Sequence, residues 1–187
     1  MTKTERLKKS ANLYDEIVEK YPRTTTAMVA QYESGNVYFD LEDNASAEKR
    51  YRSFLEKYPD QKDLAALVRL KLGYLQQKKG DSGSAMSEFR AAYEMASAKS
   101  KDQAGFELAR SLENAGKKEE AIEIYKKLST SFAQSPWAAE ANARLMVLNP
   151  PTASTPPPAA PAKEGITPPP VMGGKSPEKP KSEKPKK

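Results

Sequence analysis

Apolar residues recur through the first 148 residues at spacings of three and four, which places them on one face of successive helices. In residues 3–20 the apolar positions are Leu7, Leu13, Tyr14, Ile17 and Val18. The same kind of pattern predicts further helices at residues 25–41, 44–58, 62–79, 83–98, 100–115, 117–132 and 135–148. No segment shows the two-residue alternation of a strand, so the sequence predicts an all-α protein of about eight helices.

Polar and helix-breaking residues mark the predicted helix ends. Asp43 or Asn44 can cap the helix that follows, because their side chains accept hydrogen bonds from free N–H groups. Gly80 and Gly116 are expected to end helices, because glycine tolerates the left-handed backbone conformation. Pro136 is expected in the first turn of the last helix, where proline is well tolerated. These residues predict the helix ends independently of the apolar pattern.

Small residues recur at a long and nearly constant interval, which indicates an internal repeat. They are Ser10, Ala47, Ala85 and Ala121, separated by 37, 38 and 36 residues. A period in this range is typical of helical solenoids, in which helical hairpins stack on one another. The sequence Glu-Lys-Tyr-Pro occurs at 19–22 and again at 56–59. The N-terminal helix is therefore expected to be the second half of a repeat.

Two glycines inside predicted helices indicate close helix–helix contact. Gly35 and Gly73 each cost about 1 kcal/mol of helix stability relative to alanine, so we expect another helix to approach closely there. The expected neighbours are Ala47 and Ala85, twelve residues later on the antiparallel partner helix. Aromatic residues four positions beyond the alanines are expected to cover each crossing; they are Tyr51, Phe89 and Tyr125.

This order of residues resembles the tetratricopeptide repeat, in which small residues, a tyrosine, an alanine, an aromatic residue and a proline recur. In the first full repeat the matching residues are Gly35, Tyr38, Ala47, Tyr51 and Pro59. In the second and third they are Leu72, Gly73, Ala85, Phe89 and Ala92, then Leu108, Ala109, Ala121 and Tyr125. The resemblance covers about residues 10–148. It implies a right-handed α–α superhelix.

The distribution of proline divides the chain into two parts. Twelve of the fifteen prolines lie in residues 150–187, together with seven lysines. This composition favours a disordered tail with polyproline II character, because it offers little apolar surface to bury. The predicted repeat domain is 1–149, with a half-repeat at 3–22, repeats at about 28–61, 66–99 and 102–135, and a closing helix at 135–148.

The composition excludes several kinds of chemistry. The chain contains no cysteine and no histidine, which removes thiolate and imidazole catalysis and the commonest metal ligands. Acidic residues stand beside lysines on predicted exposed faces, with no sign of a carboxylate pair in a cleft. We therefore expect neither enzymatic activity nor a cofactor or metal site. The net charge of +6 owes much to the tail, and the nearly neutral body gives no reason to expect nucleic-acid binding.

The resemblance also implies a binding surface, because the first helix of each tetratricopeptide repeat lines a concave groove. The candidate partner-binding residues, carried over by register, are Tyr32, Asn36, Phe39, Asp40, Leu70, Tyr74, Gln77, Lys78, Phe106, Arg110 and Glu113. Aromatic residues and arginine dominate many binding energies, which favours Tyr32, Tyr74 and Arg110 as contacts. Leu70 and Phe106 can equally face the core.

These features predict a non-catalytic scaffold that binds a segment of a partner protein. The Tyr-Pro ends of the repeats resemble three bacterial envelope members of the family: the lipoprotein of the outer-membrane β-barrel assembly machine, the Tol–Pal-associated coordinator and the ancillary translocon subunit. This resemblance implies a role in envelope protein assembly or translocation and a membrane-associated partner. Two alternatives stay open: a helical-repeat protein that binds nucleic acid through its basic tail, and a self-associating structural array.

The sequence also bears on location. No stretch approaches the roughly 18 apolar residues of a membrane span, and the first thirty residues have no apolar signal core. Taken as written, the sequence predicts a soluble cytoplasmic chain. A fragment of a longer protein with an N-terminal anchor would instead lie on the periplasmic side of the cell envelope.

Overall fold

The computed structural model describes residues 1–150, apart from the side chains of residues 98 and 99, and this part of the chain is all-helical. Its eight helices are α1 (Lys3–Lys20), α2 (Thr25–Asp40), α3 (Asn44–Lys57), α4 (Lys62–Lys78), α5 (Ser82–Met95), α6 (Ala98–Asn114), α7 (Lys118–Ser131) and α8 (Pro136–Leu148). The all-α prediction is confirmed, and the predicted helix ends agree within three residues. The predicted disordered tail lies outside the described residues.

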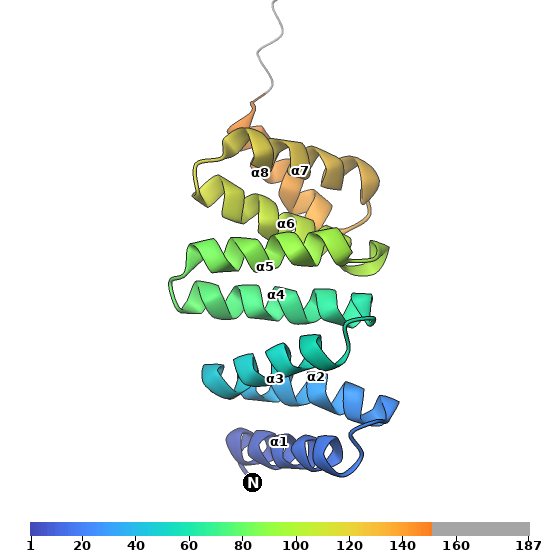
Figure 1. Ribbon diagram of the computed structural model, residues 1–187. Coiled ribbons are helices and arrows are strands. Elements are labelled where there is room, and N and C mark those ends of the chain that lie inside the picture. The colour runs from blue at the N-terminus through green and yellow to red at the C-terminus, as the bar shows by residue number, and fades with distance from the viewer. Residues whose placement is uncertain (151–187) are drawn as a thin grey trace, which may run out of the picture. The chain divides into compact units, whose positions relative to one another are not determined.

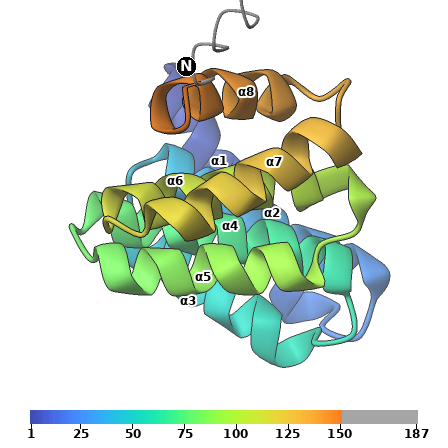
Figure 2. The same ribbon diagram turned by 90° about the horizontal axis from the view of Figure 1, so that it is seen from above.

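The helices stack in chain order as antiparallel neighbours (Figure 1). Each helix packs against the next one, and α4 also contacts α6, as α6 contacts α8. Successive hairpins are offset and rotated relative to one another (Figure 2). The result is a right-handed α–α superhelix, with the even-numbered helices α4, α6 and α8 close together on its inner side.

Local sequence sets the helix ends as expected. Asp43 caps α3, because its Oδ1 accepts a hydrogen bond from the Ser46 N–H at 3.1 Å. Gly80 and Gly116 follow α4 and α6 with φ of +80° and +78°, the left-handed region that glycine adopts without strain. Glu42 occupies the equivalent position after α2 with φ of +61°, although it is not a glycine.

Buried side chains form two hydrophobic clusters, and α4 contributes to both. Val68, Leu72 and Leu75 of α4 pack into the cluster around Tyr51 and Phe54 of α3. The other cluster joins one residue of α4 to side chains of α5, α6, α7 and α8; its largest fully buried members are Phe89, Leu108, Leu112, Tyr125 and Leu128. A single helix therefore joins the apolar interiors of the two halves of the stack.

The two helical glycines mark close contacts, but the contacting residue differs from the one expected. An added Cβ at Gly35 would lie 2.5 Å from Cε1 of Tyr51, and one at Gly73 would lie 2.7 Å from Cδ1 of Phe89. Ala47 and Ala85 were the expected neighbours, but the three atoms closest to each added Cβ belong to the aromatic ring that was expected to cover the crossing. The aromatic ring reaches further than an alanine methyl group, so the ring fills the space that the glycine leaves.

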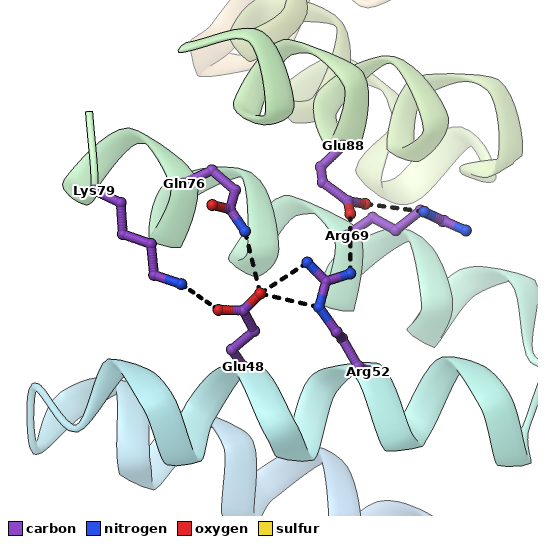
Figure 3. Close-up of polar contacts among 6 residues, drawn as sticks. All are labelled: Glu48, Arg52, Arg69, Gln76, Lys79 and Glu88. Carbon is purple, nitrogen blue, oxygen red and sulfur yellow. Dashed lines mark hydrogen bonds and ion pairs between the residues drawn. The ribbon is translucent and has the colours of Figure 1, made fainter. Parts of the chain in front are cut away.

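A polar network ties α3 to α4 and α5 (Figure 3). Glu48 of α3 is ion-paired with Arg52 and with Lys79 of α4, and it accepts a hydrogen bond from Gln76 at 3.3 Å. Glu88 of α5 pairs with Arg69 of α4 at 2.9 Å. The network crosses the junction between the hairpins α2–α3 and α4–α5.

A second polar cluster holds α1 on the stack. The carboxylate of Asp15 in α1 accepts hydrogen bonds from the Ser34 hydroxyl at 2.5 Å and from the Tyr38 hydroxyl at 2.9 Å, both on α2. It also pairs with Arg50 of α3 at 2.5 Å. Burial and this hydrogen bond raise the pKa of Tyr38. One acidic side chain thereby joins three helices.

Candidate functional site

The candidate site is the face lined by α2, α4, α6 and α8, where side chains of neighbouring even-numbered helices meet. Lys71 and Lys78 of α4 lie over the ring of Phe39 on α2, with their ammonium groups 4.9 and 4.5 Å from its centre. Tyr74 of α4 bonds to Glu107 of α6. The rings of Phe106 and Trp137, from α6 and α8, lie 5.3 Å apart. These contacts run along the whole face.

Most of the predicted groove residues are partly or fully accessible. Asp40 and Lys78 are exposed, and the half-buried ones are Tyr32, Asn36, Phe39, Tyr74, Gln77, Arg110 and Glu113. Leu70 and Phe106 are 3% and 5% exposed and belong to the hydrophobic core. These two side chains of the predicted set therefore point inward.

On α2, several of these side chains also contact the protein itself. The Tyr51 hydroxyl donates to Oδ1 of Asn36 at 2.9 Å. The rings of Tyr32 and Phe54 pack edge-to-face, with their centres 6.4 Å apart. Burial raises the pKa of Tyr51 far above its usual range. Asn36 therefore supports the core tyrosine, and its amide nitrogen donates a hydrogen bond to the Glu33 carboxylate at 3.4 Å.

The centre of the face holds a buried carboxylate that sequence analysis did not single out. Glu107 is 3% exposed, accepts a hydrogen bond from the Tyr74 hydroxyl at 2.9 Å and pairs with Arg110 at 2.6 Å. Gln103 donates to the Tyr74 oxygen at 3.3 Å. Burial and the nearby charge of Glu107 raise the pKa of Tyr74 to about 12. The phenol holds Glu107, which in turn pairs with Arg110.

Between α6 and α8 the face contains a pocket of about 330 Å³, lined by Phe106, Arg110, Pro136, Trp137 and Glu140. Phe106 and Trp137 form its aromatic floor, with ring planes inclined at 35°. The Arg110 side chain is 42% exposed although it pairs with Glu107. Neither Trp137 nor Glu140 was among the predicted groove residues. The proline–tryptophan pair at the start of the last helix was the available signal.

Glu113 is engaged in contacts within the protein and is not free to contact a partner. Its carboxylate pairs with Arg144 of α8 and accepts a hydrogen bond from the Tyr125 hydroxyl of α7 at 3.2 Å. The ion pair raises the pKa of Arg144. Glu113 therefore joins α6, α7 and α8, and its role in the structure is to position these helices.

Within residues 1–150, no three acidic side chains gather into a group that could hold a metal ion. No helix in this part of the chain has the length and apolar character needed to cross a bilayer. What the face does provide is aromatic surface, paired charges and a continuous row of contacts between helices.

Helical hairpins stacked into a superhelix with an aromatic inner face define an α-solenoid of the kind that binds proteins. Two family models described as tetratricopeptide repeat match residues 32–100 and 103–135. The chain belongs to the tetratricopeptide repeat family. Proteins of this family are generally non-catalytic scaffolds for protein–protein interaction.

Solved structures agree with this fold at low sequence identity. BtubC (BKLC) from P. vanneervenii is 20% identical with a TM-score of 0.63, over 79% of this chain and 66% of that one. A putative kinesin light chain from Podosopora anserina with nearly identical TPR-like repeats is 14% identical with a TM-score of 0.57, over 80% and 89%. YrrB, a TPR protein with an unusual peptide-binding site, is 18% identical with a TM-score of 0.53, over 78% and 79%. Comparison with curated proteins gives no match.

Proposed function

We propose that this protein is a non-catalytic scaffold that holds a segment of a partner protein against the face lined by α2, α4, α6 and α8. The observation that carries the proposal is the pocket between α6 and α8, where Arg110 and Trp137 stand beside the buried ring of Phe106. Tryptophan, tyrosine and arginine are the residues that contribute most to protein–protein binding. The groove residues proposed for contact are Tyr32, Asn36, Phe39, Asp40, Tyr74, Gln77, Lys78 and Arg110, with Trp137 and Glu140 added.

The repeat organisation belongs to the same proposal. We propose a half-repeat at 3–22, three repeats at about 28–61, 66–99 and 102–135, and a closing helix at 135–148. In this division each groove helix is the first helix of a repeat, except that α8 has no second helix among the described residues. The partner segment would then contact three successive repeats and the closing helix.

The test is to select binding peptides from a random library on the full chain and to measure their affinity for groove variants. The variants are Tyr32→Ala, Arg110→Ala and Trp137→Ala, and the matched controls are Lys126→Ala and Lys127→Ala, which are exposed on α7. Truncation of a central contact costs 2 kcal/mol or more, so we expect affinity to fall by roughly 30-fold or more. Equal affinity for the three groove variants and the controls, with helicity intact in all, would remove the proposal.

For the cellular setting we propose protein assembly or translocation at the bacterial envelope, with a membrane-associated partner. The support is the resemblance carried by the repeated Glu-Lys-Tyr-Pro at 19–22 and 56–59. Cross-linking in bacterial cells followed by isolation of envelope and cytoplasmic fractions tests this setting. Recovery of cross-linked partners from the cytoplasmic fraction alone would contradict it.

Self-association is a second candidate function, favoured by one observation on α8. Met146 and Val147 are 69% and 71% exposed, although both are apolar. If copies of the chain stack through this helix, the mass measured by light scattering rises with concentration, and Met146→Lys returns it to that of a monomer. A mass that does not change with concentration excludes the self-associating array.

A further inference from the structure

A second pocket lies where the C-terminal ends of α4 and α6 meet the N-terminal end of α5. Its volume is about 260 Å³, and it is lined by Gln77, Ser82, Gly83, Ala85, Met86, Ser111, Asn114 and Ala115. None of these side chains is charged, and most of them are small. Gln77 is also one of the predicted groove residues, so the pocket opens at one end of the proposed binding face.

The preceding junction of the array shows why the space is open here. Gly35 and Gly73 set the register between α2 and α4, and Gly73 and Ala109 set it between α4 and α6. Seven of the eight lining positions carry a larger or charged residue in the preceding junction. These are Phe39 in place of Gln77, Asn44 in place of Ser82, Ala45 in place of Gly83, Glu48 in place of Met86, Leu75 in place of Ser111, Lys78 in place of Asn114 and Lys79 in place of Ala115.

Those larger residues contact one another in the preceding junction. The Lys78 ammonium lies 4.5 Å from the centre of the Phe39 ring, and Lys79 pairs with Glu48. Leu75 is fully buried in the adjoining core. The α4–α5–α6 junction therefore lacks the aromatic ring, the ion pair and the core leucine that fill the corresponding places of the preceding junction. Their absence leaves the cavity.

A buried hydroxyl in the pocket lining favours a ligand that can form a hydrogen bond. Ser111 is 9% exposed, and its Oγ is fully buried without a hydrogen-bond partner among the described residues. A buried polar group left without a partner is destabilising, so a ligand that bonds to it gains affinity. The amides of Gln77 and Asn114 also line the pocket, and they can donate or accept.

Electrostatics argue for a neutral ligand. The pocket includes Ser82 and Gly83 of the first turn of α5, where a helix attracts negative charge. Asp81 already places a negative charge at this helix end, because its Oδ1 accepts a hydrogen bond from the Ser84 N–H at 2.9 Å. A second anion would be repelled by Asp81, and no lining residue is acidic to pair with a cation.

We propose that this pocket binds a tyrosine side chain of the partner segment, and that the buried Oγ of Ser111 turns into the pocket on binding and bonds to the phenol hydroxyl. A cavity of about 150 Å³ is large enough for benzene, so the present pocket is large enough for an aromatic ring that carries a hydroxyl group. The proposal rests on the function proposed above, because the tyrosine belongs to the segment held on the groove face. It adds a specific residue preference at the end of that face.

The pocket itself is tested with p-cresol, the side-chain analogue of tyrosine, added to the full isotope-labelled chain and followed by NMR. We expect shifts of the backbone amide signals of Gly83, Ala85 and Ala115. Ser111→Ala should weaken p-cresol binding about tenfold, the effect of one hydrogen bond, and leave toluene binding unchanged. Ser111→Leu, which installs the residue of the preceding junction, should abolish binding of both. Lys126→Leu on α7 is the control for an added apolar side chain.

Two results would overturn the proposal. Absence of shifts at these amides in the wild-type chain means that the pocket does not take an aromatic ring. Equal weakening of toluene and p-cresol by Ser111→Ala means that the hydroxyl is not the recognised group.

A further comparison separates this proposal from the groove function. Peptides selected on the groove are measured against Ser111→Leu and against Arg110→Ala. The pocket and the groove are both supported if Arg110→Ala weakens binding of all the peptides and Ser111→Leu weakens binding only of those that contain tyrosine. Loss with Arg110→Ala alone removes the tyrosine pocket and leaves the groove function. Loss with neither removes the tyrosine pocket, and it removes the groove function as well if Tyr32→Ala and Trp137→Ala also keep the affinity of the controls.

Discussion

At the scale of single residues, the glycines of α2 and α4 and the aromatic rings opposite them form one structural unit. Gly35 faces Tyr51 and Gly73 faces Phe89. The third hairpin has Ala109 at the equivalent position, and Tyr125 at the position of the ring. The sequence could predict that another group approaches these glycines closely, because a glycine inside a helix lowers its stability unless a close contact requires the small residue. It could not predict which side chain does so, since that depends on how far the ring extends across the helix crossing.

Gly73→Ala tests this unit. The added methyl group must displace the buried ring of Phe89, and overpacking of this kind costs about 1–3 kcal/mol. The better helix propensity of alanine returns about 1 kcal/mol of that. We expect a net loss of up to about 2 kcal/mol in the free energy of unfolding, measured by urea denaturation.

Gly83→Ala is the matched control, because an added Cβ there meets only Oδ1 of Asp81 at 3.7 Å among the described atoms. This variant should be as stable as the wild-type chain or slightly more stable. If both variants have the same stability, the Phe89 ring is not what makes Gly73 necessary.

Glu42 gives a prediction of the opposite sign. Its φ of +61° places a residue with a Cβ in the left-handed region, which costs roughly 1–2 kcal/mol. Glu42→Gly relieves this strain but loses chain entropy, so we expect stabilisation of about 0.5–1 kcal/mol. A higher midpoint in thermal unfolding would confirm it. Gly116→Ala, which places a Cβ at the corresponding position after α6, should lower the midpoint.

At the scale of helices, the ends were predictable and the contacts between hairpins were not. Caps such as Asp43 and the terminating glycines act within a few residues, so local sequence determines them. The pairs Tyr74–Glu107 and Glu48–Lys79 join residues about thirty positions apart. Their formation depends on the rotation between successive hairpins, which the apolar pattern leaves open. For the same reason the register alone could not tell that Leu70 and Phe106 point into the core.

The network around Glu48 predicts a dependence of stability on pH. Its hydrogen bond with Lys79, together with Arg52, lowers the pKa of Glu48 below the ordinary 4.5, against the opposing effect of burial. The unfolded chain therefore binds a proton at Glu48 more readily than the folded one. The stabilisation is fully present above about pH 4.5 and is lost as the pH falls through the folded-state pKa.

Glu48→Gln measures this contribution. The variant should be less stable than the wild-type chain at pH 7 by about 1 kcal/mol, and the difference should shrink as the pH is lowered below 4.5. Urea denaturation at a series of pH values gives both quantities. Glu16→Gln is the control, because Glu16 lies in an exposed pair with Lys20 on α1 alone. A difference that persists unchanged at low pH would contradict the assigned role of Glu48.

At the scale of the whole molecule, the binding face has a built-in reporter. The chain contains a single tryptophan, and Trp137 lines the pocket between α6 and α8. A peptide that binds the groove should change the tryptophan emission, and Arg110→Ala should reduce the affinity derived from that change by the same roughly 30-fold or more. Binding measured by another method with no change in emission would place the ligand on a different surface.

The position of α4 in both hydrophobic clusters has a consequence for how the array fails. In a solenoid with small interfaces between neighbouring repeats, one end can unfold while the other stays folded. Here the loss of α4 exposes apolar surface on both sides at once. Cleavage of α4 by a protease, or a disruptive substitution in it, would thus unfold the whole stack. The same change in α1 or α8 would unfold only that end.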